Sequence, residues 1–262
     1  MIATSFVRRI FAPGVFMCAA ILVAGTQARA DDAVPILQKM STYIGGQSTI
    51  QVAYDSDIEV ITDNLQKIQF TSSGQVLLSR PDKLRASRTG GYADVELVFD
   101  GKKLTSFGKH VGTYAQTDFS GSVDQLIDKM RSDFGIEAPG ADLLSSRSFN
   151  GLMTGAYEAQ HIGRGVVDGV ECEHLAFRAL DIDWQIWIDA GANPIPRKFV
   201  ITSKGVAGAP QYTLRIRDWK TNIQPPADAF AFKPASDVKQ VAFGSLGNID
   251  EVPPGLPQGE KK

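Results

Sequence analysis

Residues 95–109 have the sequence VELVFDGKKLTSFGK, and this stretch decides the fold class. Its first part places apolar side chains at every second position from Val95 to Phe99, which is the period of a strand. Asp100-Gly101 follows, a dipeptide typical of a tight hairpin turn. The residues after the turn again favour a strand. The stretch therefore predicts an antiparallel hairpin.

Strands and turns continue to alternate on both sides of this hairpin. Turn dipeptides such as Gly90-Gly91 separate the strands. Within the strands, Gly74 predicts a bulge or a bend, and the segment 163–165 predicts a bulge. Short turns join antiparallel neighbours, because parallel strands need long crossovers. About eleven strands joined in this way must curl, so the sequence predicts a mainly β (α+β) fold built on a single curved antiparallel sheet, a half-barrel. The predicted strands span residues 48–62, 66–79, 83–89, 95–99, 103–109, 111–117, 156–166, 170–179, 184–189, 197–203 and 212–221.

Three amphipathic segments are predicted to be helices. The first spans residues 31–44, where apolar side chains recur at helical spacing before a Gly-Gly pair. The second spans residues 122–134, and its Ser122 and Gln125 match a capping box. The third spans residues 139–146. Because an amphipathic helix needs an apolar surface to cover, we expect these helices to lie across the concave face of the sheet.

The first thirty residues have the pattern of a secretory signal peptide. Arg8 and Arg9 precede an apolar run, and a small-x-small cleavage site ends at Ala30. The uninterrupted apolar part, residues 15–24, is shorter than the roughly 20 residues that cross a bilayer. We therefore expect cleavage after Ala30 and a soluble protein in the periplasm. An uncleaved membrane anchor is the alternative.

The composition argues against several classes of partner. Loss of the signal peptide leaves 24 basic and 29 acidic side chains, a net charge of −5. Nucleic acids and anionic membranes attract basic surfaces, so neither is expected as a partner. No stretch after residue 30 is apolar enough to span a membrane, so an integral membrane protein is not expected either. Cys172 is the one cysteine left, which excludes an intramolecular disulfide.

Two pairs of residues raise the question of an enzyme or a metal site. Cys172 and His174 share one face of a strand, and thiolate with imidazole suits zinc or copper. Asp181 and Asp183 could perform acid–base chemistry or hold a hard cation. A tetrahedral site needs more ligands than the first pair offers, and no third group orients it as nucleophile and base. We therefore expect a buried cysteine, a hydrogen-bonded histidine and solvated aspartates, with no catalytic residue, no metal and no cofactor.

Six motifs carry a family resemblance. They are RPDKLR at 80–85, DGKKL at 100–104, GVECEHLAF at 169–177, DIDWQIWI at 181–188, PIPRK at 194–198 and PQY at 210–212. With these motifs, the chain resembles the DUF2092 family of predicted periplasmic proteins from about residue 33 to residue 243. Its opening helix, strand order and R-P-x-K-x-R turn are also similar to those of the outer-membrane lipoprotein carriers of the LolA and LolB type.

The resemblance implies a sheet whose helices form a lid over an apolar cavity. It also implies an arginine that holds the lid, without assigning that arginine to a position. We accordingly expect a signal peptide at 1–30, a LolA-like half-barrel domain at 31–252 and a disordered tail at 253–262. The residues predicted to form the cavity wall and the lid are Leu97, Phe99, Phe107, Leu126, Met130, Phe134, Phe177, Trp184, Ile186 and Phe199.

Three functions remain open at this point. The leading hypothesis is a soluble periplasmic binding or carrier protein, without enzymatic activity, for a lipid, an acylated protein or another hydrophobic ligand of the cell envelope. The second is an envelope interaction or assembly protein that binds no such ligand because side chains fill its half-barrel. The third is a hydrolase or metal-dependent enzyme built on the Cys–His and Asp–Asp pairs. The sequence leaves the ligand, the protein partner and the oligomeric state undetermined.

Overall fold

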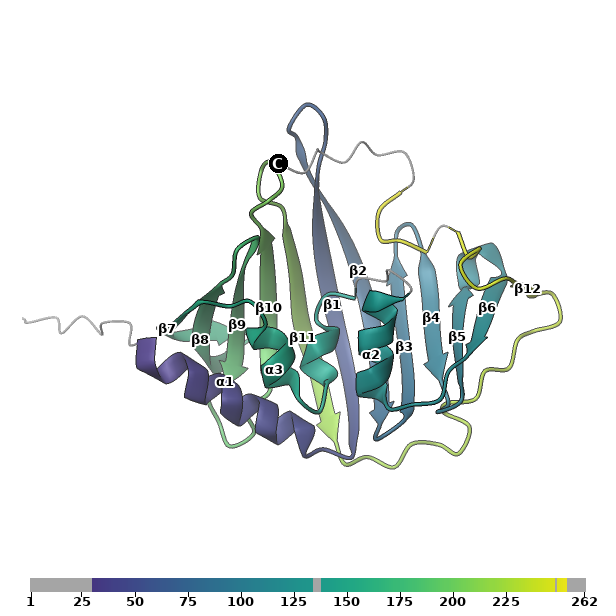
Figure 1. Cartoon of the computed structure of the whole chain (residues 1–262), viewed down its shortest axis with the longest axis horizontal. Helices are drawn as coiled ribbons and strands as arrows, with labels where there is room; N and C mark the ends of the chain where they lie inside the picture. Colours follow the sequence, from purple (N-terminus) through teal and green to yellow (C-terminus); the bar gives the residue numbers. More distant parts are fainter. Residues whose placement is uncertain (1–29, 134–137, 248, 254–262) are drawn as a thin grey trace, which may run out of the picture.

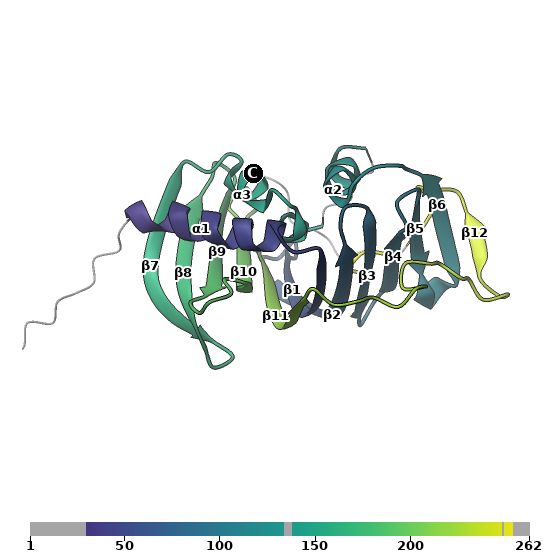
Figure 2. The ribbon, with the colours of Figure 1, turned by 90° about the horizontal axis from the view of Figure 1, so that it is seen from below.

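The computed structural model describes residues 30–133, 138–247 and 249–253 of the chain. Within these residues, twelve strands form one open sheet in the order β12-β6-β5-β4-β3-β2-β1-β11-β10-β9-β8-β7 (Figure 1). Every neighbouring pair is antiparallel except β12 and β6, which run parallel. The predicted mainly β fold with one curved, largely antiparallel sheet is confirmed, and β12 is the strand that the sequence did not predict (Figure 2).

The sheet consists of two meanders that meet at one seam. In the first meander β1 to β6 pair in sequence order, and in the second β7 to β11 do the same. The seam is the β1–β11 pair, in which Val52 lies opposite Trp219. The first meander comprises β1 Thr49–Ile61, β2 Lys67–Ser79, β3 Lys83–Gly90, β4 Asp94–Phe99, β5 Lys103–Gly108 and β6 Thr113–Asp118. The others are β7 Glu158–Val167, β8 Val170–Arg178, β9 Ile182–Asp189, β10 Pro196–Ser203, β11 Gln211–Thr221 and β12 Lys239–Val241.

The turn between β4 and β5 forms as the Asp-Gly pair predicts. Asp100 Oδ1 accepts hydrogen bonds from the backbone N–H groups of Lys102 and Lys103, at 2.9 and 2.8 Å. Gly101 has a φ of +95°, in the left-handed region that favours glycine. The aspartate side chain and the glycine backbone together fix the turn and therefore the register of the two strands.

The two glycine positions inside strands have different outcomes. The register between β7 and β8 shifts between His161 and Gly163, which confirms the predicted bulge. The bulge predicted at Gly74 is wrong, because β2 keeps regular register with both neighbours there. Gly74 lies opposite Tyr54, and a Cβ atom on it would lie only 2.2 Å from Cζ of the Tyr54 ring. The glycine therefore makes room for an aromatic ring within a regular strand ladder.

The helices lie together on one face of the sheet (Figures 1 and 2). α2 begins with the predicted capping box, in which Ser122 Oγ accepts from Gln125 N and Gln125 Oε1 accepts from Ser122 N. The predicted third helix, 139–146, is instead a short 3₁₀ turn followed by a separate helix, α3. The helical segments are α1 Ala30–Gly45, η1 Lys109–Val111, α2 Val123–Ser132, η2 Ala141–Leu144 and α3 Ser148–Met153.

Buried polar contacts with α1 explain where α3 begins. Ser41 Oγ of α1 accepts hydrogen bonds from the Ser148 hydroxyl and the Phe149 backbone N–H, both at 2.9 Å. Ser41 and Ser148 are 3 % and 0 % exposed, so these bonds satisfy polar groups that water cannot reach. A contact between residues about a hundred positions apart leaves no periodic signal in the local sequence. The helix was therefore missed.

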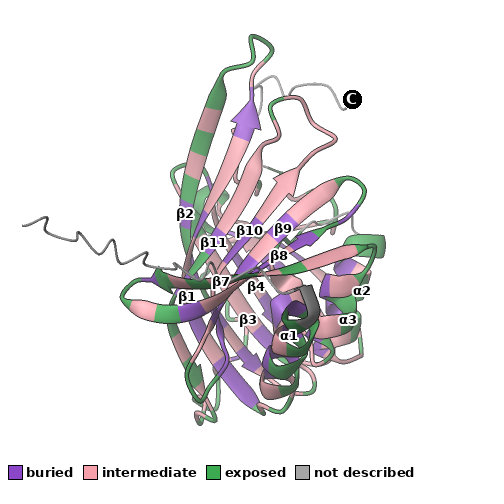
Figure 3. Ribbon diagram, turned by 90° about the vertical axis from the view of Figure 1, so that its left-hand side faces the viewer, coloured by how far each residue is buried: buried purple, intermediate pink, exposed green. Residues whose placement is uncertain are grey.

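The main core lies between the helices and the concave face of the sheet. Leu37, Met40 and Ile44 of α1 are fully buried, as the predicted helical spacing requires, and Leu175 and Ile186 are fully buried on the sheet. Figure 3 shows buried positions in purple on the inner strands and exposed positions in green on the outer side of the helices. The tip of the β1–β2 hairpin projects beyond the neighbouring strands and is exposed.

The segment after β11 wraps around the edge of the sheet. It first crosses the face away from the helices (Figure 2). There the ring of Phe232 packs on Phe107 and Tyr114, with centroids 5.6 and 5.0 Å apart. The segment then adds β12 to the edge of β6 and returns over the concave face, where Ile249 contacts Arg88. The predicted tail lies almost wholly outside the described residues.

Candidate functional site

An apolar chamber lies between the sheet and the helical layer. Strands β1 to β4 and β11 form one wall, and α2 and η2 form the other. The chamber has a volume of about 150 Å³. Six of its lining residues are Val52, Leu97, Ile127, Met130, Leu143 and Leu214.

A wider hollow adjoins the chamber at the second meander. Its volume is about 490 Å³, and Trp184, Phe199 and Ile201 supply much of its apolar floor. Tyr212 and residues 138–140 line both spaces, so the two are neighbours. Polar side chains border this hollow, whereas the chamber wall is almost wholly apolar.

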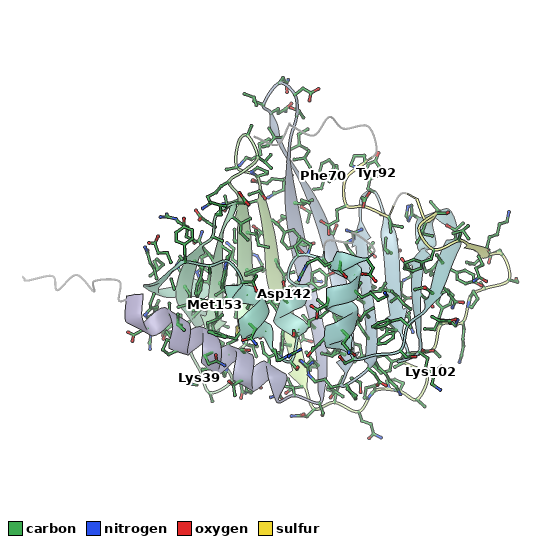
Figure 4. All side chains as sticks on the ribbon, viewed as in Figure 1. Lys39, Phe70, Tyr92, Lys102, Asp142 and Met153 are labelled. Atoms are coloured by element: carbon green, nitrogen blue, oxygen red, sulfur yellow. The ribbon has the colours of Figure 1, made fainter. Side chains whose placement is uncertain are left out.

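An ion pair stands at the border of the wider hollow. Arg131 Nη2 donates to both carboxylate oxygens of Asp142, each at 3.0 Å. In Figure 4, Asp142 lies in the helical layer in front of the sheet, and Met153 lies farther along that layer. The pair joins α2 to η2, and because Arg131 is half exposed we expect it to add little to stability.

The chamber is small compared with ligand sites in general. A cavity of roughly 150 Å³ holds one benzene molecule, whereas sites for drug-sized ligands measure roughly 300–1,000 Å³. The chamber alone therefore accommodates only a short apolar group. A long acyl chain fits only if α2 and η2 move away from the sheet or if the chain extends into the wider hollow.

Polar groups at the chamber wall are sparse. The indole N–H of Trp219 is buried, and it has no hydrogen-bond partner among the described residues. Burial raises the pKa of Tyr54 to about 12, so its phenol remains a neutral donor at neutral pH. The Tyr54 hydroxyl is a donor for a ligand whose otherwise apolar body carries an oxygen atom.

Arg80 connects the helices beneath the chamber. Its guanidinium donates to the backbone oxygen of Gln47 at 3.1 Å and to that of Leu144 at 2.7 Å. Its Nη1 lies 3.7 Å from the carboxylate of Asp124, and both side chains are about 15 % exposed. That carboxylate in turn accepts from the backbone and hydroxyl of Ser146. One arginine in the turn after β2 thus holds the end of α1, η2 and the start of α2.

Arg80 is the residue that sequence reasoning missed. The RPDKLR motif contained it, and the resemblance implied an arginine that holds the lid, but no local pattern connected the two. The contacts of Arg80 are to backbone oxygens far away in sequence. Only its position after a strand and before a proline distinguished it from the other arginines.

The predicted cavity residues divide into five groups. Leu97 and Met130 line the chamber, while Trp184 and Phe199 line the wider hollow. Phe107 does not belong to this wall, because strand alternation puts it on the opposite face, against Phe232. Phe134 lies outside the described residues. The remaining four, Phe99, Leu126, Phe177 and Ile186, are buried in the core around these spaces.

The cysteine and histidine have separate roles in packing. Cys172 is fully buried, and its thiol donates to the backbone oxygen of Val170 at 3.4 Å. His174 Nε2 lies 2.9 Å from Gln185 Oε1, and its ring stacks on Trp187 with centroids 4.0 Å apart. Neither side chain is directed at the other as a nucleophile and base would be.

The two aspartates lie at the other end of the same strands. Asp183 is paired with Lys204 at 2.8 Å, and the backbone oxygen of Asp181 accepts from Lys204 N. Cys172 lies opposite Asp189, whereas Asp183 lies opposite Arg178, so the two pairs do not converge. Across residues 30–133, 138–247 and 249–253, no three His, Cys, Asp or Glu side chains are grouped closely enough to hold a metal ion.

The sequence matches one family model over most of its length. The model is described as "Predicted periplasmic protein (DUF2092)", and the match covers residues 33–244. The chain belongs to the DUF2092 family. This confirms the resemblance carried by the sequence motifs. Among curated proteins, none matches the sequence of this DUF2092 protein.

Three solved structures are similar to this DUF2092 protein. An uncharacterised conserved protein from Thermus thermophilus has 11 % identity and a TM-score of 0.48, with 80 % of this chain and 99 % of that chain covered. LprF from Mycobacterium bovis has 12 % identity and a TM-score of 0.46, with coverages of 76 % and 98 %. A LolA superfamily protein from Nitrosomonas europaea has 15 % identity and a TM-score of 0.34, with coverages of 76 % and 97 %.

No helix within the described residues of this DUF2092 protein is long and apolar enough to cross a membrane.

Proposed function

We propose that this protein is exported to the periplasm, is cleaved after Ala30, and binds or carries an amphiphile there through residues 31–252. The ligand class is a lipid, an acylated protein or another hydrophobic molecule of the envelope. The observation that carries the proposal is the apolar chamber between the sheet and α2, which adjoins a wider hollow with a polar border. Apolar burial, at about 25 cal/mol per Å², would drive the binding.

Uptake of a long acyl chain requires the helical layer to move or the chain to extend into the wider hollow. The chamber of about 150 Å³ is too small for a long chain while α2 and η2 rest on the sheet. Arg80 holds both elements through Asp124 and Leu144. We therefore assign to Arg80 the role of keeping the helices closed when no ligand is bound. A ligand that enters would replace helix–sheet contacts with contacts of its own.

The first test is extraction of the mature protein from its own periplasm without detergent. Native mass spectrometry would give the mass of the bound species, and lipid mass spectrometry would give its class. We expect an acyl-bearing molecule at about one per protein. A protein that is free of lipid and also fails to bind the uncharged probe N-phenyl-1-naphthylamine would contradict the proposal.

A matched pair of variants tests whether the chamber is the binding site. Ala86 lines the chamber, and its neighbour Ser87 lies on the opposite face of the sheet. Ala86→Phe should fill the chamber and reduce probe uptake severalfold, while Ser87→Phe should leave uptake unchanged. Circular dichroism spectra of the two purified variants check that both are folded. Equal uptake by the two variants would place binding elsewhere.

The small volume of the chamber favours a second candidate function. A half-barrel filled largely by its own side chains suits an envelope interaction or assembly protein. The β7 edge strand also exposes Val166 at 70 %, and an edge strand presents backbone groups that can pair with a partner. Cross-linking in the periplasm through a photoreactive residue at position 166 tests this. A single protein adduct, together with a lipid-free chamber, would favour the second candidate.

A further inference from the structure

One arginine of the concave face lies at the edge of the chamber. In β3, Leu84 and Ala86 line the chamber, and Arg88 is the next residue on the same face. Two residues along a strand span about 7 Å, so the Cα atom of Arg88 lies close to that of Ala86 and to the chamber wall. Arg88 lies opposite Gly74, which in turn lies opposite Tyr54, another lining residue. The Tyr54 ring occupies the space left by the missing side chain at Gly74, so its phenol lies over the strand next to Arg88.

The segment near the end of the chain supplies partners for this guanidinium. Arg88 Nη1 lies 2.8 Å from Oε1 of Glu251, and Nη2 donates to the backbone oxygen of Ile249. The side chains of Arg88 and Glu251 are only 20 % and 15 % exposed. A carboxylate and a carbonyl therefore engage one guanidinium in a place partly shielded from water. A charge-assisted pair of this kind is stronger than a surface ion pair.

Tyr54 and Tyr212 belong to the same cluster as Arg88 and Glu251, because both charged groups affect the pKa of each phenol. Burial raises the pKa of Tyr54 to about 12, an effect that Arg88 opposes and Glu251 reinforces. Burial also raises the pKa of Tyr212, with Glu251 and Tyr54 as further causes. Both phenols line the chamber and remain protonated donors. The end of the apolar chamber therefore carries one cation and two hydroxyl donors, the complement of an anionic head group on an apolar chain.

We propose that Arg88 recognises the anionic head group, a carboxylate or a phosphate, of the amphiphile whose chain occupies the chamber, and that residues 249–251 compete for that site. This inference rests on the proposed function. Glu251 and the backbone oxygen of Ile249 stand in for the head group in the closed protein. A ligand with an anionic head displaces them, and an uncharged ligand of equal length gains nothing from Arg88.

The test compares two competitors with the same twelve-carbon chain, laurate and 1-dodecanol. Each displaces N-phenyl-1-naphthylamine from the full mature protein, at a pH of about 8 where laurate is charged. Glu251→Gln keeps the shape of the side chain but removes the competing charge, so it should tighten laurate binding about fivefold. Arg88→Met should weaken laurate binding by at least as much. Neither change should alter the affinity for 1-dodecanol.

Arg217→Met is the control for loss of an arginine charge. Arg217 is paired with Asp55 at 3.0 Å and is half exposed, away from the chamber. Arg217→Met should leave the affinities for laurate and 1-dodecanol unchanged. Acetate, the head group without the chain, should displace no probe at the concentrations at which laurate does. If acetate displaces the probe as well as laurate does, Arg88 is a small-anion site that needs no chain and the inference is wrong.

The outcomes separate this inference from the proposed function. If the neutral probe binds but laurate affinity is the same in the wild type and Glu251→Gln, the head-group site is wrong and the carrier function stands. If Arg88→Met weakens laurate and 1-dodecanol equally, the arginine supports the fold only, and the inference is again wrong. If the neutral probe binds to none of the proteins, the carrier function fails and the head-group site fails with it.

Discussion

Gly74 illustrates how one missing side chain shapes the concave face. A Cβ atom there would lie 2.2 Å from Tyr54 Cζ and 2.6 Å from the backbone oxygen of Ser87. The tyrosine ring could rotate away, but the backbone of the neighbouring strand has less freedom. The sequence suggested a bulge because glycine inside a strand has two common causes, irregular backbone and close packing, which only the partner residue distinguishes.

Substitution of this glycine should therefore destabilise the sheet. We expect Gly74→Ala to lower the free energy of unfolding by about 1–3 kcal/mol, because overpacking forces strand and ring apart. Urea denaturation followed by circular dichroism measures the change. Gly91→Ala is the matched control, since a Cβ at Gly91 meets no atom within 4 Å. If the two variants are equally stable, the packing of the Tyr54 ring does not require a glycine at position 74.

His174 gives the protein a pH-dependent contribution to stability. Burial lowers the pKa of its imidazole, an effect that the hydrogen bond to Gln185 opposes and Lys198 reinforces. The unfolded chain, whose histidines have a pKa near 6.5, then binds the proton more readily than the folded one. The stabilising contribution is present above about pH 6.5 and is lost as the pH falls through the lower folded-state pKa.

The measurement compares wild type with His174→Gln in urea at about pH 7.5 and about pH 5.5. We expect the wild type to lose stability relative to the variant as the pH falls. His110→Gln controls for loss of an imidazole at an exposed position. A constant difference between wild type and His174→Gln at the two pH values would disprove the assignment.

At the scale of elements, α2 depends on how its first turn is closed. Ser122 and Gln125 each satisfy a backbone N–H of the other, at 3.2 and 2.8 Å. Ser122→Ala should cost about 1 kcal/mol, measured as the change in the free energy of unfolding. Ser120→Ala, two residues earlier and exposed, is the control. No difference between the two variants would mean that contacts with the sheet alone fix α2.

The elements that sequence reasoning found are those with local causes. The β4–β5 hairpin follows from alternation and an Asp-Gly turn, and α2 from its capping box and apolar stripe. The missed elements, α3 and β12, have distant causes. α3 is fixed by Ser41 of α1, and β12 is three residues long and gains its pairing only at the edge of β6. The pattern of polar and apolar residues along the sequence indicates neither contact.

The candidate site follows the same division. Leu97 and Met130 were predicted because strand alternation and helical spacing identify the side that faces the core. Phe107 was assigned to the wrong face because its strand carries one large apolar residue on each side, Leu104 on the concave face and Phe107 on the other. Arg80 and Arg88 could not be found, since their partners are backbone oxygens and a carboxylate supplied by segments far away in sequence.

At the scale of the whole molecule, β12 covers one edge of the sheet. Gln240 lies opposite Tyr114 in the parallel β12–β6 pair. An uncovered edge strand invites pairing with another molecule. Gln240→Pro should release β12, speed amide hydrogen exchange in β6 and promote self-association on warming, as measured by light scattering. Gln240→Ala, which keeps the backbone N–H, should behave as the wild type does. Unchanged exchange in both variants would contradict this role.

The seam between the two meanders has a consequence for how the protein folds. Most strand pairs join neighbours in sequence, whereas β1 and β11 are brought together across most of the chain, as Val52 and Trp219 show. Local hairpins form quickly and long loops close slowly, so closure of the seam is the slow event. The chamber has walls on both sides of the seam and exists only after closure. A bound amphiphile would therefore contact both meanders and stabilise the seam between them. We expect a protein with bound ligand to resist heat and proteases better than one without it.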